Sequence, residues 1–235
     1  MLIRPQNLSA NLQALHDRIA AAAAQHARSV DSVTLLAVGK GQPAAALAEA
    51  AALGLRDFGE NYLQEALPKI EQLRDAGLTW HFIGQVQSNK TRDIATRFDW
   101  VHTIDRAKIA QRLSEQRPPH LAPLQACIQL RLGDEPGKGG VDPADAPALV
   151  ETIRGLQRIR LRGLMCVPPA EVTEAAQRRW FAQARALRDA LVAGFPGLEL
   201  DTLSMGMSGD LEVAIAEGAT LVRIGTALFG PRRRD

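Results

Sequence analysis

Lysine, cysteine and tyrosine are scarce in this sequence, and each shortage narrows the chemistry available to the chain. Of the 28 basic residues only five are lysines, so a reaction that needs an amine has few candidates: Lys40, Lys69, Lys90, Lys108 and Lys138. The two cysteines, Cys127 and Cys166, lie far apart in apolar stretches. This placement favours small buried residues in a reducing compartment over a disulfide framework.

Long apolar runs and an excess of one charge are also missing. No segment approaches the roughly 20 apolar residues of a membrane-spanning helix. The formal net charge of +2 favours neither nucleic acid nor an anionic membrane as a partner. The N-terminal segment carries Arg4, Asp17 and Arg18 and lacks the unbroken apolar run of a signal peptide. Because the five histidines also show no metal-site spacing, we expect a cytoplasmic protein without a metal.

Short β-rich runs alternate with helical patterns along the chain, after one amphipathic segment that predicts a helix over about 5–28. Eight runs predict strands: Val33–Val38, Leu55–Phe58, Trp80–Ile83, Trp100–Ile104, Leu124–Leu132, Leu161–Val167, Leu200–Ser204 and Leu221–Ile224. Apolar stripes between them predict helices, one of them over 211–215 with Ser208 as its N-cap. Eight units in about 200 residues favour a (β/α)8 TIM barrel over 33–232, within a single domain of residues 1–235. A doubly wound sheet would more often show a GxGxxG turn after the first strand, and none is present.

Lys40 stands between two glycines where the first predicted strand ends. In such barrels the functional residues lie at the C-terminal ends of the strands. A partly desolvated amine there has a lowered pKa and becomes nucleophilic. The sequence around Lys40 leaves two interpretations open: Lys40 forms a Schiff base with a ligand, or it pairs with Glu60.

The eighth predicted strand is followed by Gly225 and Thr226, just before a terminal helical turn. The loop after this strand is the usual phosphate-binding site of the fold. Ser204 and the "MGMS" turn after the seventh strand would complete it, although a simple turn remains the alternative. A reactive amine facing an anion site implies a ligand that is an aldehyde with a phosphate. His81, inside a strand, is expected to be a core residue that could also pack beside a ring.

Five segments carry a resemblance to a known family: "AVGKGQP", "FGENYLQEA", "WHFIGQVQSNKTR", "LRGLMCVPP" and "LSMGMSGDLEVAIAEGATLVRIGTALFGPR". From about Leu35 to Arg232 they resemble, in order, the pyridoxal phosphate homeostasis proteins. The resemblance implies a barrel similar to the N-terminal domain of alanine racemase, with pyridoxal 5'-phosphate bound to Lys40 as a Schiff base. The cofactor-binding positions that it implies are Lys40, Asn61, Ser204, Met205, Arg223, Gly225 and Thr226. Arg223 falls at the pyridine-nitrogen position, unless it is a core arginine paired with a carboxylate such as Glu60.

The sequence departs from this family at three places. The family usually reads Ser-Lys-Thr where this chain has Gly39-Lys40-Gly41, so two hydroxyls beside the lysine are missing. Most members read Pro-Leu at Gln85-Val86. The segment "LRLGDEPGKGGV" keeps only the Lys138-x-Gly part of its usual pattern. Lys138 is either a solvated loop lysine or a second amine that visits the barrel mouth.

The family implies a carrier that controls free pyridoxal phosphate and supplies it to other enzymes, with no catalytic residue of its own. A racemase of this fold needs a tyrosine from a separate β-domain of a partner, and the only tyrosine here is Tyr62. We therefore expect a monomeric binding protein, with apo-enzymes as recipients. The alternatives are a weakly active amino-acid racemase or related pyridoxal phosphate enzyme, and a Schiff-base aldolase.

Overall fold

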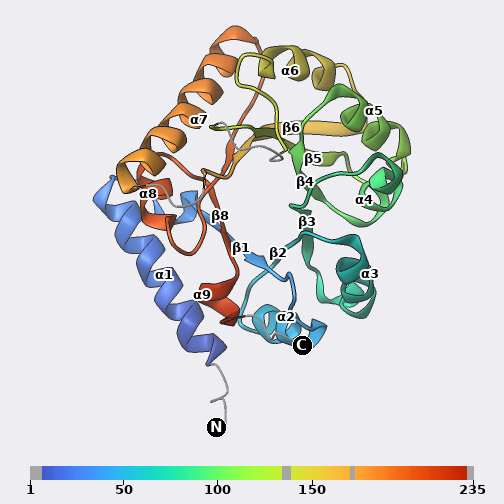
Figure 1. The fold of residues 1–235 in the computed structure, drawn as a ribbon. Coiled ribbons are helices and arrows are strands. Elements are labelled where there is room, and N and C mark those ends of the chain that lie inside the picture. The colour runs from blue at the N-terminus through green and yellow to red at the C-terminus, as the bar shows by residue number, and fades with distance from the viewer. Residues whose placement is uncertain (1–6, 134–138, 170–172, 232–235) are drawn as a thin grey trace.

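The strands form one closed parallel barrel in chain order, from β1 to β8 and back to β1 (Figure 1). The computed structural model describes residues 7–133, 139–169 and 173–231. Its strands are β1 Thr34–Val38, β2 Asp57–Glu60, β3 Thr79–Phe82, β4 Trp100–Ile104, β5 Leu124–Leu130, β6 Ile159–Cys166, β7 Thr202–Ser204 and β8 Leu221–Ile224. Every boundary lies within two residues of the expected one, and the predicted (β/α)8 barrel is confirmed.

The helices lie outside the barrel and cover it (Figure 1). They are α1 Leu8–Gln25, α2 Ala44–Ala52, α3 Leu63–Gln72, α4 Thr91–Arg97, α5 Ala107–Gln116, α6 Ala146–Arg154, α7 Glu174–Gly194, α8 Leu211–Ala216 and α9 Thr226–Phe229, with short 3-10 turns at Val30–Ser32, Arg74–Ala76 and Ser88–Lys90. In the described residues no helix is both long and apolar enough to cross a lipid bilayer.

The leading helix α1 is shorter than the expected 5–28. Asn7 caps its start, because the Asn7 side chain accepts a hydrogen bond from the backbone N–H of Ala10. Residues 5 and 6 lie outside the described ranges, and at the other end Ala27 adopts a φ of 52° that stops the helix. The apolar stripe of α1 packs on α8 and α9, where Asn11 donates to the carbonyl of Leu228 at 2.9 Å.

The second strand is displaced by two residues from the expected Leu55–Phe58 to Asp57–Glu60. Leu55 is buried in the turn before the strand, so its apolar character reflects core packing rather than strand pairing. The strand continues instead to Glu60, which pairs with Phe82 of β3. This register places a carboxylate at the very end of the strand, next to the loop that carries Lys40.

Candidate functional site

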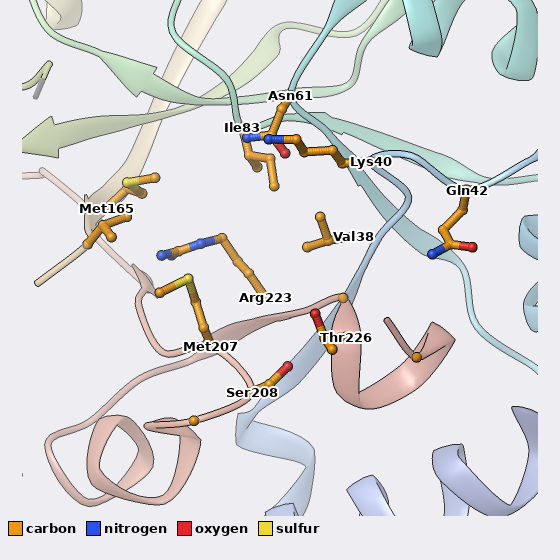
Figure 2. Close-up of a pocket in the computed structure, with 14 residues that line it drawn as sticks. Val38, Lys40, Gln42, Asn61, Ile83, Met165, Met207, Ser208, Arg223 and Thr226 are labelled. Carbon is orange, nitrogen blue, oxygen red and sulfur yellow. The ribbon is translucent and has the colours of Figure 1, made fainter. Parts of the chain in front are cut away.

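The C-terminal ends of the strands surround a cavity of about 340 Å³ (Figure 2). This volume lies within the range of about 300–1,000 Å³ typical of small-molecule sites. Its lining residues are Val38, Lys40, Gln42, Asn61, Ile83, Met165, Val167, Met207, Ser208, Gly209, Arg223, Gly225, Thr226 and Gly230. In Figure 2, Lys40 and Asn61 lie at one end of the cavity, and Ser208 and Thr226 lie at the other.

The amine of Lys40 stands at the cavity wall beside a tyrosine. Lys40 Nζ lies 3.3 Å from the hydroxyl of Tyr62 and 4.7 Å from the centroid of its ring. The expected alternative, a pair between Lys40 and Glu60, is wrong for this structure because Glu60 pairs with Lys69. Among the described residues no carboxylate lies within ion-pair distance of the Lys40 amine, which leaves that amine facing the cavity.

A second lysine, Lys69, supports the loop that carries Lys40, a role that its sequence position does not indicate. Lys69 Nζ lies 2.7 Å from Glu60 Oε1 and donates to the carbonyl of Gly39 at 2.8 Å. Both members of this ion pair are buried, with Glu60 fully enclosed. Burial raises the pKa of the Glu60 carboxyl, and the hydrogen bond and charge of Lys69 act in the opposite direction.

This buried pair explains the first of the two glycines beside Lys40. A Cβ on Gly39 would lie 2.5 Å from Glu60 Oε1, so a serine there would force the carboxylate to move. Gly41 adopts a φ of 70°, a left-handed conformation that glycine reaches without steric cost. Both glycines therefore suit the local structure around Lys40: the first lies against Glu60, and the second adopts a backbone conformation that a threonine rarely takes.

Arg223 reaches the cavity from β8 and is only 5% exposed. Its Nη1 donates to the carbonyl and the hydroxyl of Ser204 at 2.6 and 3.0 Å, and its Nη2 donates to the carbonyl of Cys166 at 3.0 Å. The expected alternative, in which Arg223 pairs with Glu60, is also wrong for this structure. Burial lowers the pKa of the Arg223 guanidinium, but such a group still stays protonated in proteins.

The far end of the cavity combines hydroxyls with backbone donors. Thr226 is the first residue of α9, and the first N–H groups of a helix have no partner within it. Ser208 was expected to cap α8, but Asp210 takes that position and accepts from the backbone N–H of Met207 at 2.5 Å. Ser208 accepts instead from the N–H of Ala227 at 3.3 Å, which joins the turn after β7 to α9.

The structure brings five of the seven expected binding residues to one cavity: Lys40, Asn61, Arg223, Gly225 and Thr226. Ser204 and Met205 are buried behind the wall and do not line it. Sequence reasoning missed the apolar wall formed by Val38, Ile83, Met165 and Met207. Strand-end position could have identified Val38 and Ile83, because each is the last residue of a predicted strand. Lys138 lies outside the described residues.

His81 is a buried core residue, as expected, and it contacts a second histidine. Its Nδ1 lies 2.9 Å from Nε2 of His102, and its Nε2 lies 3.0 Å from Asp57 Oδ1. Burial lowers the pKa of both histidines. Within the described ranges no cluster of histidine, cysteine or acidic residues is placed to hold a metal ion.

A closed barrel with a lysine after its first strand and a hydroxyl-lined cavity after its eighth defines a protein of the alanine racemase N-terminal type. The family described as alanine racemase, N-terminal domain, matches residues 4–233. Within this class, the chain belongs to the family of pyridoxal phosphate homeostasis proteins. It is 56% identical over 225 residues to the member from Pseudomonas aeruginosa, covering 96% of each chain. It is 47% identical over 234 residues to the member from Escherichia coli, covering 96% of this chain and 97% of that one.

Solved structures agree with this assignment. PipY of Synechococcus elongatus, in a structure with pyridoxal phosphate bound, is 40% identical and superposes with a TM-score of 0.85 over 95% of this chain and 100% of its own. The alanine racemase of Corynebacterium glutamicum is 20% identical, with a TM-score of 0.69 over 95% of this chain and 62% of that chain. This second likeness concerns the fold alone.

Proposed function

We propose that this chain binds pyridoxal phosphate through Lys40 and serves to carry or buffer the cofactor in vitamin B6 homeostasis. The observation that carries the proposal is the Lys40 amine, which faces a cavity with a guanidinium in its wall and hydroxyl groups at its far end. The residues of the cavity fit the chemistry of the cofactor. The Lys40 amine suits its aldehyde, the Arg223 guanidinium suits its ring nitrogen, and the hydroxyl of Thr226 suits its phosphate. The similarity to PipY with bound pyridoxal phosphate supports this fit.

Each part of the cavity has a separate task in this proposal. When bound, pyridoxal phosphate supplies an aldehyde that reacts reversibly with amines. Lys40 provides the amine, and Arg223 presents an N–H donor to the ring nitrogen. A guanidinium at that position keeps the nitrogen unprotonated, whereas a carboxylate would promote its protonation. Ser208, Gly225 and Thr226 receive the phosphate, while Ser204 acts behind the wall on Arg223.

The phosphate end of the cavity gives a direct test. Wild-type protein should bind pyridoxal, which lacks the phosphate, about 100-fold more weakly than pyridoxal phosphate, because several charge-assisted hydrogen bonds are lost. Thr226→Val should weaken pyridoxal phosphate about tenfold and leave pyridoxal unchanged, as measured by absorbance titration. Thr96→Val, on the outer helix α4, is the matched control. Equal affinities for the two ligands would contradict this phosphate site.

We further propose that the protein is not an enzyme and that apo-enzymes receive its cofactor. A weakly active racemase is the second candidate, and one observation favours it: the Tyr62 hydroxyl stands 3.3 Å from the Lys40 amine. Position along the chain does not show that the Tyr62 side chain reaches Lys40, so the sequence alone did not indicate this contact. This hydroxyl could exchange a proton with the Lys40 amine, although it does not replace the tyrosine that a partner's β-domain supplies in a racemase of this fold.

A turnover experiment separates the two candidates. Loaded protein incubated with L-alanine should show no racemisation at enzymatic rates, and it should activate an apo-enzyme that needs pyridoxal phosphate. The readouts are chiral analysis of alanine and the activity of the recipient. Sustained racemisation that disappears in both Lys40→Ala and Tyr62→Phe would favour the enzyme.

The cellular setting completes the proposal. We take residues 1–235 as one cofactor-binding domain that acts as a cytoplasmic monomer. Two buried free cysteines are compatible with a reducing compartment. Burial raises the pKa of the Cys166 thiol to about 12, so this thiol stays protonated and does not compete with Lys40 for an aldehyde.

A further inference from the structure

A chain of hydrogen bonds crosses the barrel interior from the cofactor cavity to the opposite end. Arg223 Nη1 donates to the hydroxyl of Ser204 at 3.0 Å, and that hydroxyl lies 2.8 Å from Nδ1 of His102. Nε2 of His102 lies 2.9 Å from Nδ1 of His81, whose Nε2 lies 3.0 Å from Asp57 Oδ1. The five residues come from five strands, β8, β7, β4, β3 and β2, so the chain joins distant parts of the sheet.

The two ends of this chain fix the direction of every bond in it. Arg223 can only donate, and an ionised Asp57 can only accept. With both histidines neutral, each group between these ends has one hydrogen to place on the chain. The Ser204 hydroxyl then donates to His102 Nδ1. The Nε2–H of His102 donates to His81 Nδ1, and the Nε2–H of His81 donates to Asp57. Any other combination of tautomers would put two hydrogens on one of these bonds and none on another.

Burial keeps the two histidines neutral, which this order of bonds requires. Burial lowers the pKa of His81, although the hydrogen bond to Asp57 and the charges of Asp57 and Asp99 act against it. Burial also holds the pKa of His102 well below its ordinary value, and the positive charges of a protonated His81 and of Arg223 add to the effect. Trp100 stacks on the ring of His81 with an interplanar angle of 10°, which restricts rotation of that imidazole.

The Arg223 cation makes no direct ion pair, and the charge of Asp210 acts on it only from a longer distance. Among the described residues no carboxylate lies within ion-pair distance of the Arg223 guanidinium, which is held by two carbonyls and one hydroxyl. Aligned hydrogen bonds polarise one another in a low-dielectric interior. The carboxylate of Asp57 thus makes the Ser204 oxygen a better acceptor for Arg223, through two neutral imidazoles.

We propose that Asp57, His81 and His102 are positioning residues for the cofactor site, which orient the Arg223 guanidinium toward the ring nitrogen through the Ser204 hydroxyl. This inference rests on the proposed function, because it assigns the ring to Arg223. It gives Ser204 a role that differs from the direct cofactor contact expected from the sequence.

Asp57, at the far end of this chain of hydrogen bonds, can be substituted without changing the lining of the cofactor cavity. The side chain of Asp57 is 31% exposed and lines a second depression of about 640 Å³ on the opposite side of the barrel, together with Asp17 and Arg56. Asp57→Asn keeps the shape of the side chain, and its amide oxygen can still accept from His81. The variant removes the charge alone, at a site that the cofactor does not touch.

The first experiment measures the tautomers in wild-type protein without cofactor. Nitrogen NMR of histidine-labelled protein should show His81 and His102 neutral at neutral pH, with the hydrogen on Nε2. A hydrogen on Nδ1 of either ring, or titration of either ring with an ordinary pKa, would overturn the proposed order of bonds. No variant is involved, so the result does not depend on the folding of a mutant.

The second experiment compares two aspartate variants that face the same depression. Asp57→Asn should weaken pyridoxal phosphate about threefold to tenfold and shift the absorption maximum of the bound cofactor. Asp17→Asn makes the same charge change but contacts Gln13 on α1 rather than a histidine, and it should match wild type in both readouts.

The outcomes separate this inference from the function that it assumes. Identical affinity and spectrum for Asp57→Asn and Asp17→Asn would remove the positioning role while leaving cofactor binding intact. A rescue of both readouts by Asp57→Glu would support the role of the charge. A wild-type protein that bound no pyridoxal phosphate would contradict the proposed function and the positioning role together, whatever the tautomers.

Discussion

Lys40→Ala should abolish the covalent retention of pyridoxal phosphate. Borohydride reduction of loaded wild-type protein should fix the cofactor on one peptide, the one that contains Lys40, because among the described residues this is the lysine amine that lines the cavity. The alanine variant should yield no fixed cofactor, and its yellow colour should disappear on gel filtration. Peptide mapping by mass spectrometry measures both results.

Lys40→Arg is the matched control for this experiment. It keeps the positive charge beside Tyr62, whereas its guanidinium is permanently protonated and a poor nucleophile. Weak, non-covalent binding in Lys40→Arg together with no fixed cofactor would assign the covalent role to the amine itself. A label confined to Lys69, Lys90 or Lys108 in wild-type protein would contradict the assignment.

Lys69→Ala should destabilise the barrel by about 3–5 kcal/mol, the typical cost of leaving a buried charge without its partner. Glu60 is fully buried, and its Oε2 already has no hydrogen-bond partner among the described atoms, so the loss of Lys69 would strip the carboxylate of its one ion pair within 4 Å. Denaturant unfolding measures the change. Lys69 also holds the carbonyl of Gly39, so affinity for the cofactor should fall with stability.

Two comparisons check the physical reason for that loss. Arg74→Ala removes an exposed partner of Glu71 and should cost less than about 1 kcal/mol. The double variant Lys69→Met with Glu60→Gln should recover much of the stability, because no unpaired charge remains. A single variant Lys69→Ala as stable as Arg74→Ala would show that Glu60 takes up a proton or reaches water at little cost.

The barrel could be predicted from the sequence because its strands and helices have different periods of hydrophobicity. The runs at Trp100–Ile104 and Leu221–Ile224 match β4 and β8 at both ends. The displaced strand β2 shows where hydrophobic periodicity fails to give the correct strand boundaries. Apolar character identifies burial, and the buried Leu55 of the preceding turn looks the same as a strand residue.

The site was predictable in part, for reasons of geometry. Lys40 and Thr226 follow strands directly, so the fold alone sends them to the cavity. Ser204 also stands at a strand end, but its side chain points into the barrel toward His102, a contact across 102 positions of sequence. The pair of Lys69 with Glu60 was missed because Lys69 lies in the last turn of a helix, where lysines are usually solvated.

The first elements of the chain, α1 and β1, pack against the last ones, α8, α9 and β8, and this affects how the protein folds during synthesis. The Asn11 contact with Leu228 spans 217 positions, and β1 finds its second neighbour only when β8 has been made. During synthesis, the part of α1 that packs on α8 and α9 therefore stays exposed until those late helices have been made. Loop closure over such distances is slow, and exposed apolar surface favours aggregation in the meantime. A nascent chain thus contains Lys40 early but lacks Gly225 and Thr226 until late, so capture of the cofactor should wait until β8 and α9 have been made.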